Sequence, residues 1–199
     1  MGLLAIALAY ALGGIPFGLI IVKLKTGKDV RQAGSGNIGA TNVLRTTGTA
    51  AGILTLLLDA AKAWTAVWLA DRLTGGNILW MSFAALSVLA GHVFPAWLGF
   101  KGGKAVASFI GAFAYLAWLP LVAVLLIFIA VLATSRYLSL GSIIAAGLFP
   151  IACWMILHPD WPLLVAATAS AALIIWRHKT NIDRIRAGNE NIFRFRRSA

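Results

Sequence analysis

Long apolar runs that carry almost no charge dominate this chain and restrict it to folds that a lipid bilayer can hold. They lie near residues 3–22, 48–70, 77–94, 105–118, 119–134, 141–157 and 162–176. A helix that crosses the hydrocarbon core needs roughly 20 such residues. The run at 3–22 lacks the positively charged start of a cleaved signal peptide, so we expect it to remain as a span. Because 60% of the residues are hydrophobic and only 12% are charged, the sequence predicts an all-α integral membrane protein with a single transmembrane domain over residues 1–199.

The segment 105–134 decides the topology, because it is too long for one ordinary span and short for two. If it forms two helices hinged at Pro120, Arg72 lies alone on one side of the membrane and fifteen cations lie on the other. If it forms one helix, Arg136 and the seven cations after it change sides and this asymmetry is lost. The positive-inside rule therefore predicts seven transmembrane helices, some short, with the N-terminus outside and the C-terminus in the cytoplasm. The fifteen cations are Lys23, Lys25, Lys28, Arg31, Arg45, Lys101, Lys104, Arg136, Arg177, Lys179, Arg184, Arg186, Arg194, Arg196 and Arg197.

Polar segments interrupt the apolar runs at Ser35–Arg45, His92–Lys104, Ser139–Ser142 and Arg177–Glu190. Their glycines let a backbone approach a ligand closely, and their hydroxyls, amides and arginine suit a phosphate. In the predicted topology the first three segments lead into the cytoplasmic N-termini of spans two, four and six. Helix N-termini present unpaired N–H groups and the positive end of the dipole, which favours bound anions. The sequence thus predicts an anion site on the cytoplasmic face.

Two cations stand out from the basic loops. Most cytoplasmic lysines are explained by topology, and some could rest against anionic head groups. We expect Arg45 and Lys104 at helix starts, where a cation opposes the dipole unless an anion is bound nearby. The pair Gly102-Gly103 could also be a plain turn.

Ionisable residues also occur within the apolar part of the chain. Asp59 and Lys62 lie three residues apart inside the run at 48–70, on one helix face. Such residues are costly in a membrane and are usually functional or paired. The two charges could neutralise each other, or Lys62 could partner the cytoplasmic site. His92, at the membrane boundary, could be a ligand or could serve packing and hydrogen bonding.

The sequence lacks the residues that several classes of enzyme chemistry require. One cysteine and three scattered histidines are too few for a zinc site, so we expect no metal and no cofactor. Cys153 lies in an apolar run and is expected to be a small buried or lipid-facing hydrophobe. There is no Walker sequence and no readable hydrolase triad. His178 and Asp183 match a short H-x-x-x-x-D pattern, but positions five apart on a helix do not face each other. Nothing indicates nucleic-acid binding.

Three segments together carry a family resemblance: S-G-N-I-G-A-T-N-V-L-R, G-H-V-F-P-A-W-L-G-F-K-G-G-K-A-V-A and R-H-K-T-N-I-D-R-I-R-A-G-N-E. In order and spacing they resemble the three motifs of the bacterial acyl-phosphate:glycerol-3-phosphate acyltransferases, the PlsY family. The resemblance implies a seven-span enzyme of the bacterial inner membrane with its active site facing the cytoplasm and membrane lipids around it. It implies acyl transfer from acyl phosphate to the sn-1 hydroxyl of glycerol 3-phosphate, giving lysophosphatidic acid and phosphate for phospholipid synthesis. Acyl-CoA and acyl carrier protein thioesters would not serve as donors.

The predicted site follows from these motifs. We expect direct transfer without an acyl-enzyme, because an acyl phosphate is already an activated anhydride and positioning supplies much of the rate. The general base is either His178 or a phosphate oxygen of the substrate. Glu190 could order the tail or position a glycerol hydroxyl. The predicted catalytic residues are Lys104, Arg45, His178 and Ser35. The predicted phosphate- and substrate-binding residues are Gly36, Asn37, Gly39, Thr41, Asn42, Lys101, Gly102, Gly103, Ser142, Asn181 and Glu190.

A membrane transporter of phosphorylated metabolites is the alternative, because basic, glycine-rich loops at helix ends would also suit an anion carrier. Against it, the chain shows no repeat of one half in the other, and the polar motifs cluster on one face. A structural scaffold would leave the three dense motifs unexplained.

Overall fold

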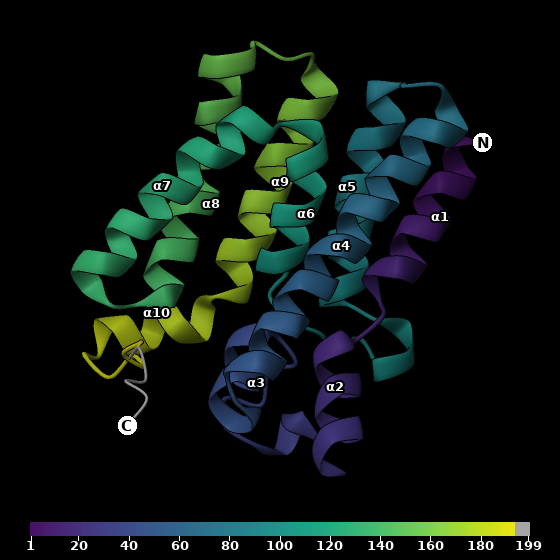
Figure 1. The fold of residues 1–199 in the computed structure, drawn as a ribbon. Helices are drawn as coiled ribbons and strands as arrows, with labels where there is room; N and C mark the ends of the chain where they lie inside the picture. Colours follow the sequence, from purple (N-terminus) through teal and green to yellow (C-terminus); the bar gives the residue numbers. More distant parts are fainter. Residues whose placement is uncertain (194–199) are drawn as a thin grey trace. The chain divides into compact units, whose positions relative to one another are not determined.

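The computed structural model describes residues 1–193, and this part of the chain is helical without strands (Figure 1). Arg194, Arg196 and Arg197, which entered the charge argument, lie outside the described residues. The helices are α1 (Gly2–Gly13), α2 (Phe17–Thr26), α3 (Ala40–Thr47), α4 (Thr49–Thr74), α5 (Ile78–Val93), α6 (Val106–Leu116), α7 (Trp118–Ser135), α8 (Leu138–Leu157), α9 (Trp161–Arg177) and α10 (Lys179–Arg186), with 3-10 turns η1 (Val30–Gln32) and η2 (Ala96–Leu98).

Apolar helices long enough to cross a membrane account for most of the chain. Within residues 1–193, five segments have the length and composition of a span, and two further apolar helices, α6 and α9, are shorter. The five are Gly2–Thr26, Thr49–Thr74, Ile78–Leu98, Trp118–Ser135 and Leu138–Leu157. The all-α prediction is confirmed over this part of the chain. The described residues form two compact units, residues 1–116 with α1 to α6 and residues 117–193 with α7 to α10.

The first apolar run, predicted as a span over 3–22, has the length and composition of a span as Gly2–Thr26, but it consists of two helices. α1 ends at Gly13 and α2 begins at Phe17, because Pro16 has no N–H to continue a helix. Side chains from other helices satisfy the carbonyl groups at the break. Trp97 Nε1 donates to the Gly14 oxygen at 2.7 Å, and Lys62 Nζ donates to the Ile15 oxygen at 2.8 Å. Irregular backbone at membrane depth is tolerated where the protein itself pairs it.

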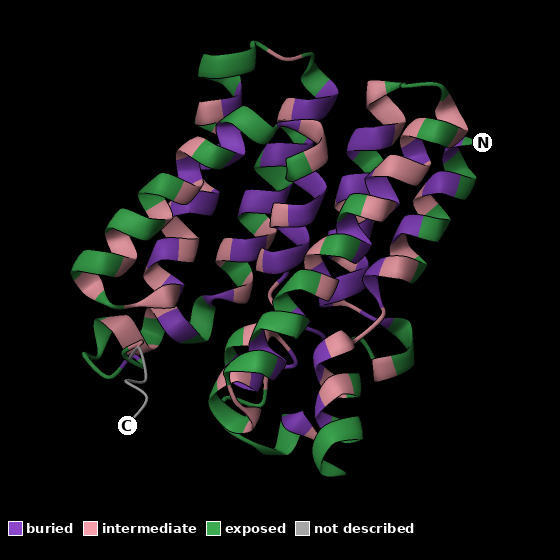
Figure 2. Ribbon diagram, in the orientation of Figure 1, coloured by how far each residue is buried: buried purple, intermediate pink, exposed green. Residues whose placement is uncertain are grey.

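Small residues let the helices of the first unit approach closely. α1 packs on α5, and α4 packs on α6. A methyl group at Gly13 would collide with the Val88 carbonyl, and one at Gly111 would collide with the Ala60 carbonyl. Such contacts are typical of helix pairs in membranes. Buried residues accordingly form stripes along α4 and α5, whereas much of α2 is exposed (Figure 2).

The segment 105–134 forms two helices, as predicted, but they separate at Ala117 rather than at Pro120. Pro120 lies in the first turn of α7, where its missing N–H would have no partner in any case. In the second unit α7 packs on α8 and α8 packs on α9. α8 begins at Leu138, so Ser139 and Ser142 lie in its first turns and do not precede it as predicted.

Candidate active site

The first polar motif is a loop followed by the short helix α3, and the buried amide of Asn42 holds the loop together. Asn42 Oδ1 accepts the N–H of Ser35 at 2.9 Å. Its Nδ2 lies 2.8 Å from the Asn37 oxygen, 3.0 Å from the Ala33 oxygen and 3.3 Å from the Val30 oxygen. We predicted Asn42 as a phosphate ligand. The structure uses its amide to shape the loop.

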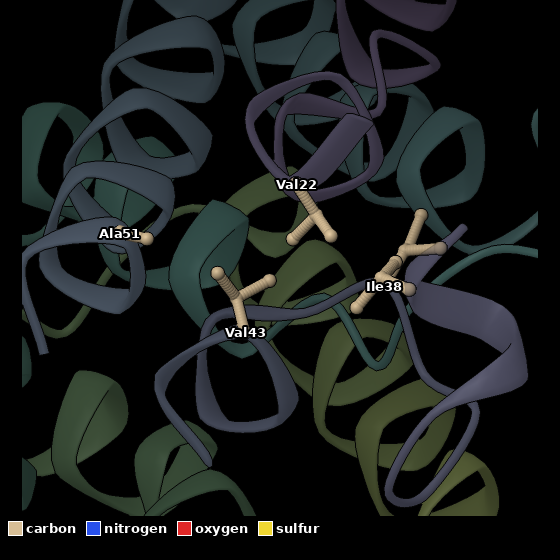
Figure 3. Close-up of a cluster of buried hydrophobic side chains, with 5 residues drawn as sticks. Val22, Ile38, Val43 and Ala51 are labelled. Atoms are coloured by element: carbon tan, nitrogen blue, oxygen red, sulfur yellow. The ribbon is translucent and has the colours of Figure 1, made fainter. Parts of the chain in front are cut away.

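An apolar cluster lies beneath this loop, built from Val22 of α2, Val30 of η1, Ile38 and Val43 of the motif, and Ala51 of α4. Figure 3 shows Val22, Ile38, Val43 and Ala51 converging. Leu98, in the second motif, packs against the same cluster. Burial of these side chains therefore fixes the first motif to the membrane helices and brings the first two motifs together within one unit.

The surface of the first motif offers donors. α3 begins after Gly39, so the N–H groups of Ala40 and Thr41 lie in its first turn, at the positive end of its dipole. Ser35, Gly36 and Thr41 are exposed. Asn37 Oδ1 accepts the N–H of Gly39 at 2.8 Å, which stabilises the entry into the helix. This end of α3 can receive an anion.

Arg45 does not lie at a helix start, and this corrects the electrostatic argument made from the sequence. Gly48, with φ 110°, separates α3 from α4, so Arg45 occupies the last turn of α3 and is exposed. A cation there is favoured by the helix dipole without any anion. The case for Arg45 at the site therefore rests on its place in the motif and on its guanidinium chemistry.

The second motif folds back on itself at its two glycines. The N–H of Gly102 donates to the Val93 oxygen at 3.0 Å, and that of Gly103 donates to the His92 oxygen at 3.1 Å. A methyl group at Gly102 would overlap the His92 carbonyl, and one at Gly103 would overlap the His92 imidazole. These amides close the loop within the chain, and phosphate binding at Gly102 and Gly103 stays a prediction.

Lys104 stands directly ahead of a helix, as predicted. It is half-buried, and α6 begins two residues later at Val106. Phe100 and Ala105 adopt left-handed backbone conformations, with φ of 62° and 61°. Such conformations in residues other than glycine persist where the surroundings impose them, often at functional sites. Lys101 is exposed on the same turn of chain.

A buried polar cluster lies behind the second motif. Lys62 Nζ is 2.6 Å from Asp59 Oδ1 and 3.0 Å from His92 Nδ1, and His92 Nδ1 is 3.7 Å from Asp59 Oδ1. The sequence indicated the Asp59–Lys62 pair but not the third member. His92 comes from α5, thirty residues further along the chain, and only helix packing brings it there.

In the second unit, Glu190 is the centre of the third motif. Its Oε1 accepts from Ser139 Oγ at 3.0 Å and from Asn181 Nδ2 at 2.8 Å, and its Oε2 accepts from Arg184 Nε at 2.8 Å. Burial alone raises the pKa of this carboxyl, but the hydrogen bonds from Asn181, Arg184 and Ser139 outweigh it and hold the pKa below its usual value. Of the two predicted roles for Glu190, the structure shows the one that orders the tail.

His178 is buried at the junction of α9 and α10. Its Nδ1 lies 2.8 Å from the Ile174 carbonyl oxygen. A carbonyl oxygen can only accept, so Nδ1 carries a proton and Nε2 is the nitrogen that can take one. Asp183 is exposed on α10. Ser142 Oγ donates to the Leu138 oxygen at 2.9 Å, within α8.

The predicted residues thus fall into one group in each unit. The first unit gathers Ser35–Arg45 with Lys101–Lys104, and the second holds Ser142, His178, Asn181 and Glu190. Among residues 1–193, no three His, Cys, Asp or Glu side chains lie together as metal ligands would.

Comparison with known proteins shows the family to which this chain belongs. The profile of the family described as glycerol-3-phosphate acyltransferase matches residues 3–188. The chain belongs to the glycerol-3-phosphate acyltransferase family. Relatives named glycerol-3-phosphate acyltransferase include proteins of Rhodopseudomonas palustris (44% identical, covering 94% of this chain and 93% of the relative) and Trichlorobacter lovleyi (46% identical, covering 97% and 98%).

Solved structures of one glycerol-3-phosphate acyltransferase share the fold. The chain resembles crystal structures of PlsY, an integral membrane glycerol 3-phosphate acyltransferase. The glycerol 3-phosphate form matches with a TM-score of 0.91, 36% identity and coverage of 97% of this chain and 96% of that one. The lysophosphatidic acid form matches with a TM-score of 0.88, 34% identity and coverage of 97% and 95%. The chain is therefore a multi-pass membrane protein of an acyltransferase family.

Proposed function

We propose that this protein transfers a fatty acyl chain from acyl phosphate to the sn-1 hydroxyl of glycerol 3-phosphate, releasing lysophosphatidic acid and phosphate. One observation carries the proposal. Within one compact unit, the first motif and Leu98 of the second motif share an apolar cluster, and each motif carries groups that suit a phosphate, namely the donor-rich start of α3 in the first motif and Lys101 and Lys104 in the second. Such an arrangement suits phosphate groups at a membrane interface, where a lipid donor and a small soluble dianion can meet. The glycerol 3-phosphate and lysophosphatidic acid forms of the related structures support it.

Roles for the residues follow from their chemistry. Ser35, Gly36, Asn37, Gly39 and Thr41 surround the start of α3 and would supply donors to one phosphate. Lys104 would stabilise the negative charge that develops on the carbonyl oxygen and the leaving phosphate. Arg45 would hold a phosphate through its planar fork, with His178 and Asn181 of the third motif serving the same reaction. Asn42, Gly102, Gly103 and Glu190 would keep these groups in place.

The reaction needs no covalent enzyme intermediate. The glycerol hydroxyl oxygen attacks the acyl carbonyl carbon, the carbon–oxygen bond to phosphate breaks, and phosphate leaves. The hydroxyl proton passes to a phosphate oxygen of the substrate, whose second pKa is near 6, or to Nε2 of His178. We favour the substrate phosphate, with His178 orienting it. Positioning the two substrates then supplies much of the rate enhancement.

The membrane arrangement belongs to the same proposal. We place seven spans in one transmembrane domain, with the N-terminus outside and the active site on the cytoplasmic face of the bacterial inner membrane. The five long apolar segments, the two shorter helices α6 and α9, and the basic residues between them support this arrangement.

Steady-state kinetics in detergent test the proposal. Purified protein should release phosphate from acyl phosphate only when glycerol 3-phosphate is present, which a transporter would not do. Lys104→Ala should lower kcat/KM about 100-fold or more, the scale of one transition-state contact. Arg45→Lys should raise the KM for glycerol 3-phosphate, because lysine keeps the charge but loses the fork.

Lys25→Ala is the matched control, because Lys25 is an exposed cation in the last turn of α2 and has only a topological role in the proposal. It should keep wild-type rates. If folded Lys104→Ala and Arg45→Ala also ran at wild-type rates, the two cations would have no part in the chemistry.

A further inference from the structure

The cluster of Asp59, Lys62 and His92 is unused by the reaction as proposed. Their side chains are 3%, 2% and 4% exposed, inside an apolar bundle. Ion pairs so deeply buried contribute little net stability, and apolar residues of similar volume often serve as well or better. A membrane interior makes the charges still more expensive. The cluster therefore calls for a role other than stability.

Its geometry determines the state of the histidine. The Lys62 ammonium has two hydrogen-bonding neighbours, the Ile15 carbonyl oxygen at 2.8 Å and His92 Nδ1 at 3.0 Å, and forms an ion pair with Asp59 Oδ1 at 2.6 Å. A charged Lys62 ammonium can only donate, so Nδ1 of His92 is the acceptor in this contact. The imidazole is then neutral with its proton on Nε2, and Lys62 fixes both the tautomer and the ring orientation.

The other edge of this ring faces Gly103, later in the same motif. A methyl group at Gly103 would lie 3.0 Å from Cδ2 of His92 and would overlap Nε2. The N–H of Gly103 donates to the carbonyl oxygen of His92 itself at 3.1 Å. Ring and backbone of one residue thus hold Gly103 from two sides. Lys104 is the next residue, so its backbone begins where His92 places Gly103.

We propose that Asp59, Lys62 and His92 act as positioning residues that set the place of Lys104 for catalysis. Asp59 forms an ion pair with Lys62, and Lys62 orients the His92 ring through a hydrogen bond. His92 in turn fixes the backbone at Gly103. Through its contact with the Ile15 oxygen, Lys62 also ties this support to the break between α1 and α2. The inference rests on the proposed function only for the role of Lys104. It gives the buried ions a task at the active site without any contact with substrate.

A double-mutant cycle between His92 and Gly103 tests the proposal. Asparagine at position 92 can still accept from Lys62 near the place of Nδ1, but it ends short of Gly103. We expect His92→Asn to lower kcat about tenfold to 100-fold, because small misplacements of a catalytic group have effects of this size. Its KM values should stay within about twofold, since no substrate contact is removed.

Gly103→Ala should be severe alone, because the methyl group collides with the imidazole. The same change should have less than about a threefold effect in the His92→Asn background, where the space is open. If Gly103→Ala does not fold, the double variant should fold and be more active than that single variant. A Gly103 amide that bound phosphate directly would instead give equal losses in both backgrounds, and additive effects on kcat would overturn the proposal.

The melting temperature separates positioning from simple stability. A His92→Asn protein that melts far below wild type but keeps its kcat would overturn the inference. Failure of the proposed function has a different signature, because wild-type protein would then leave acyl phosphate unconsumed in the presence of glycerol 3-phosphate. If the wild type is active but the substitutions at positions 92 and 103 have independent effects on kcat, the inference is refuted and the proposed function stands.

Discussion

Replacing Asn42 by aspartate exchanges one NH2 group for an oxygen and should weaken the hydrogen bonds that close the loop of the first motif. Asn42 Oδ1 still has a counterpart in aspartate, so the bond from the Ser35 N–H at 2.9 Å can survive. The Nδ2 group becomes an oxygen that faces the carbonyl oxygens of Asn37 at 2.8 Å and Ala33 at 3.0 Å. The Val30 carbonyl oxygen, 3.3 Å from Nδ2, meets the same oxygen. Because the amide group has two protons, the loss amounts to two donated hydrogen bonds, which are replaced by repulsion.

The magnitude follows from these contacts. A buried polar group that loses its partner costs about 1–3 kcal/mol, and water reaches Ala33 because this residue is exposed. Two lost bonds therefore weaken the closed loop by about 2–4 kcal/mol. Since 1.4 kcal/mol is a factor of ten, the population of the open loop should rise roughly 30- to 1000-fold. The KM for glycerol 3-phosphate should rise as well, because the start of α3 would no longer be held.

Hydrogen exchange measured by mass spectrometry on peptides that cover residues 33–43 is the direct assay. The amides of Ser35 and Gly36 should exchange faster by the factor of local opening. Asn37→Asp is the matched control in the same loop, because Asn37 uses only its Oδ1, which accepts the Gly39 N–H at 2.8 Å. Aspartate keeps that acceptor and adds negative charge at a helix N-terminus, which is favourable. Wild-type exchange in Asn42→Asp, or equal opening in Asn37→Asp, would refute the role assigned to the Asn42 amide.

Three further predictions concern the tail, the thiol and the topology. Since the pKa of Glu190 is held below its ordinary 4.5, its carboxylate stabilises the fold fully above that pH, and this contribution is lost as the pH falls through the lowered pKa. Melting temperatures of wild type and Glu190→Gln should thus differ by a constant amount between about pH 6 and 8, and this difference should shrink as the pH falls below 4.5 through the lowered pKa. Cys153→Ala should keep most of the activity, because Cys153 is fully buried in α8 and no acyl-enzyme is proposed; a trapped acyl-protein adduct would contradict this. In that cysteine-free background, Ser35→Cys in sealed vesicles should react with an impermeant maleimide from the cytoplasmic side, and labelling only from the outside would invert the proposed topology.

Hydropathy alone predicted most of the helices, because a span is a property of a local window of residues. α4, α5 and α9 lie within a few residues of the predicted runs. Prediction and structure differ where a single proline or glycine ends a helix, because an average over a hydropathy window does not detect such a residue. Pro16 interrupts the run at 3–22, and Gly48 separates α3 from α4 and moves Arg45 from a helix start to a helix end. Both signals were present in the sequence, but hydropathy does not weigh them.

The motifs predicted which segments hold the candidate site but not what each group does in it. A sequence shows that Gly102 and Gly103 permit a close approach, and the structure shows that the approach is to His92 of the same chain. The partnership of His92 with Lys62 depends on how α4 and α5 are rotated against each other. No pattern within either segment specifies that rotation, so sequence reasoning left the role of His92 open.

The break between α1 and α2 affects how the protein inserts into the membrane during its synthesis. The segment Gly2–Thr26 leaves the ribosome before Lys62 and Trp97 do, so the carbonyl groups of Gly14 and Ile15 lack these eventual partners at that time. Exposed carbonyls are unfavourable in lipid, so the nascent segment should enter the bilayer with this break in contact with water or the translocon. It should then settle only after α4 and α5 have joined it. Maturation of the first span is thereby delayed until the polypeptide has reached at least Trp97.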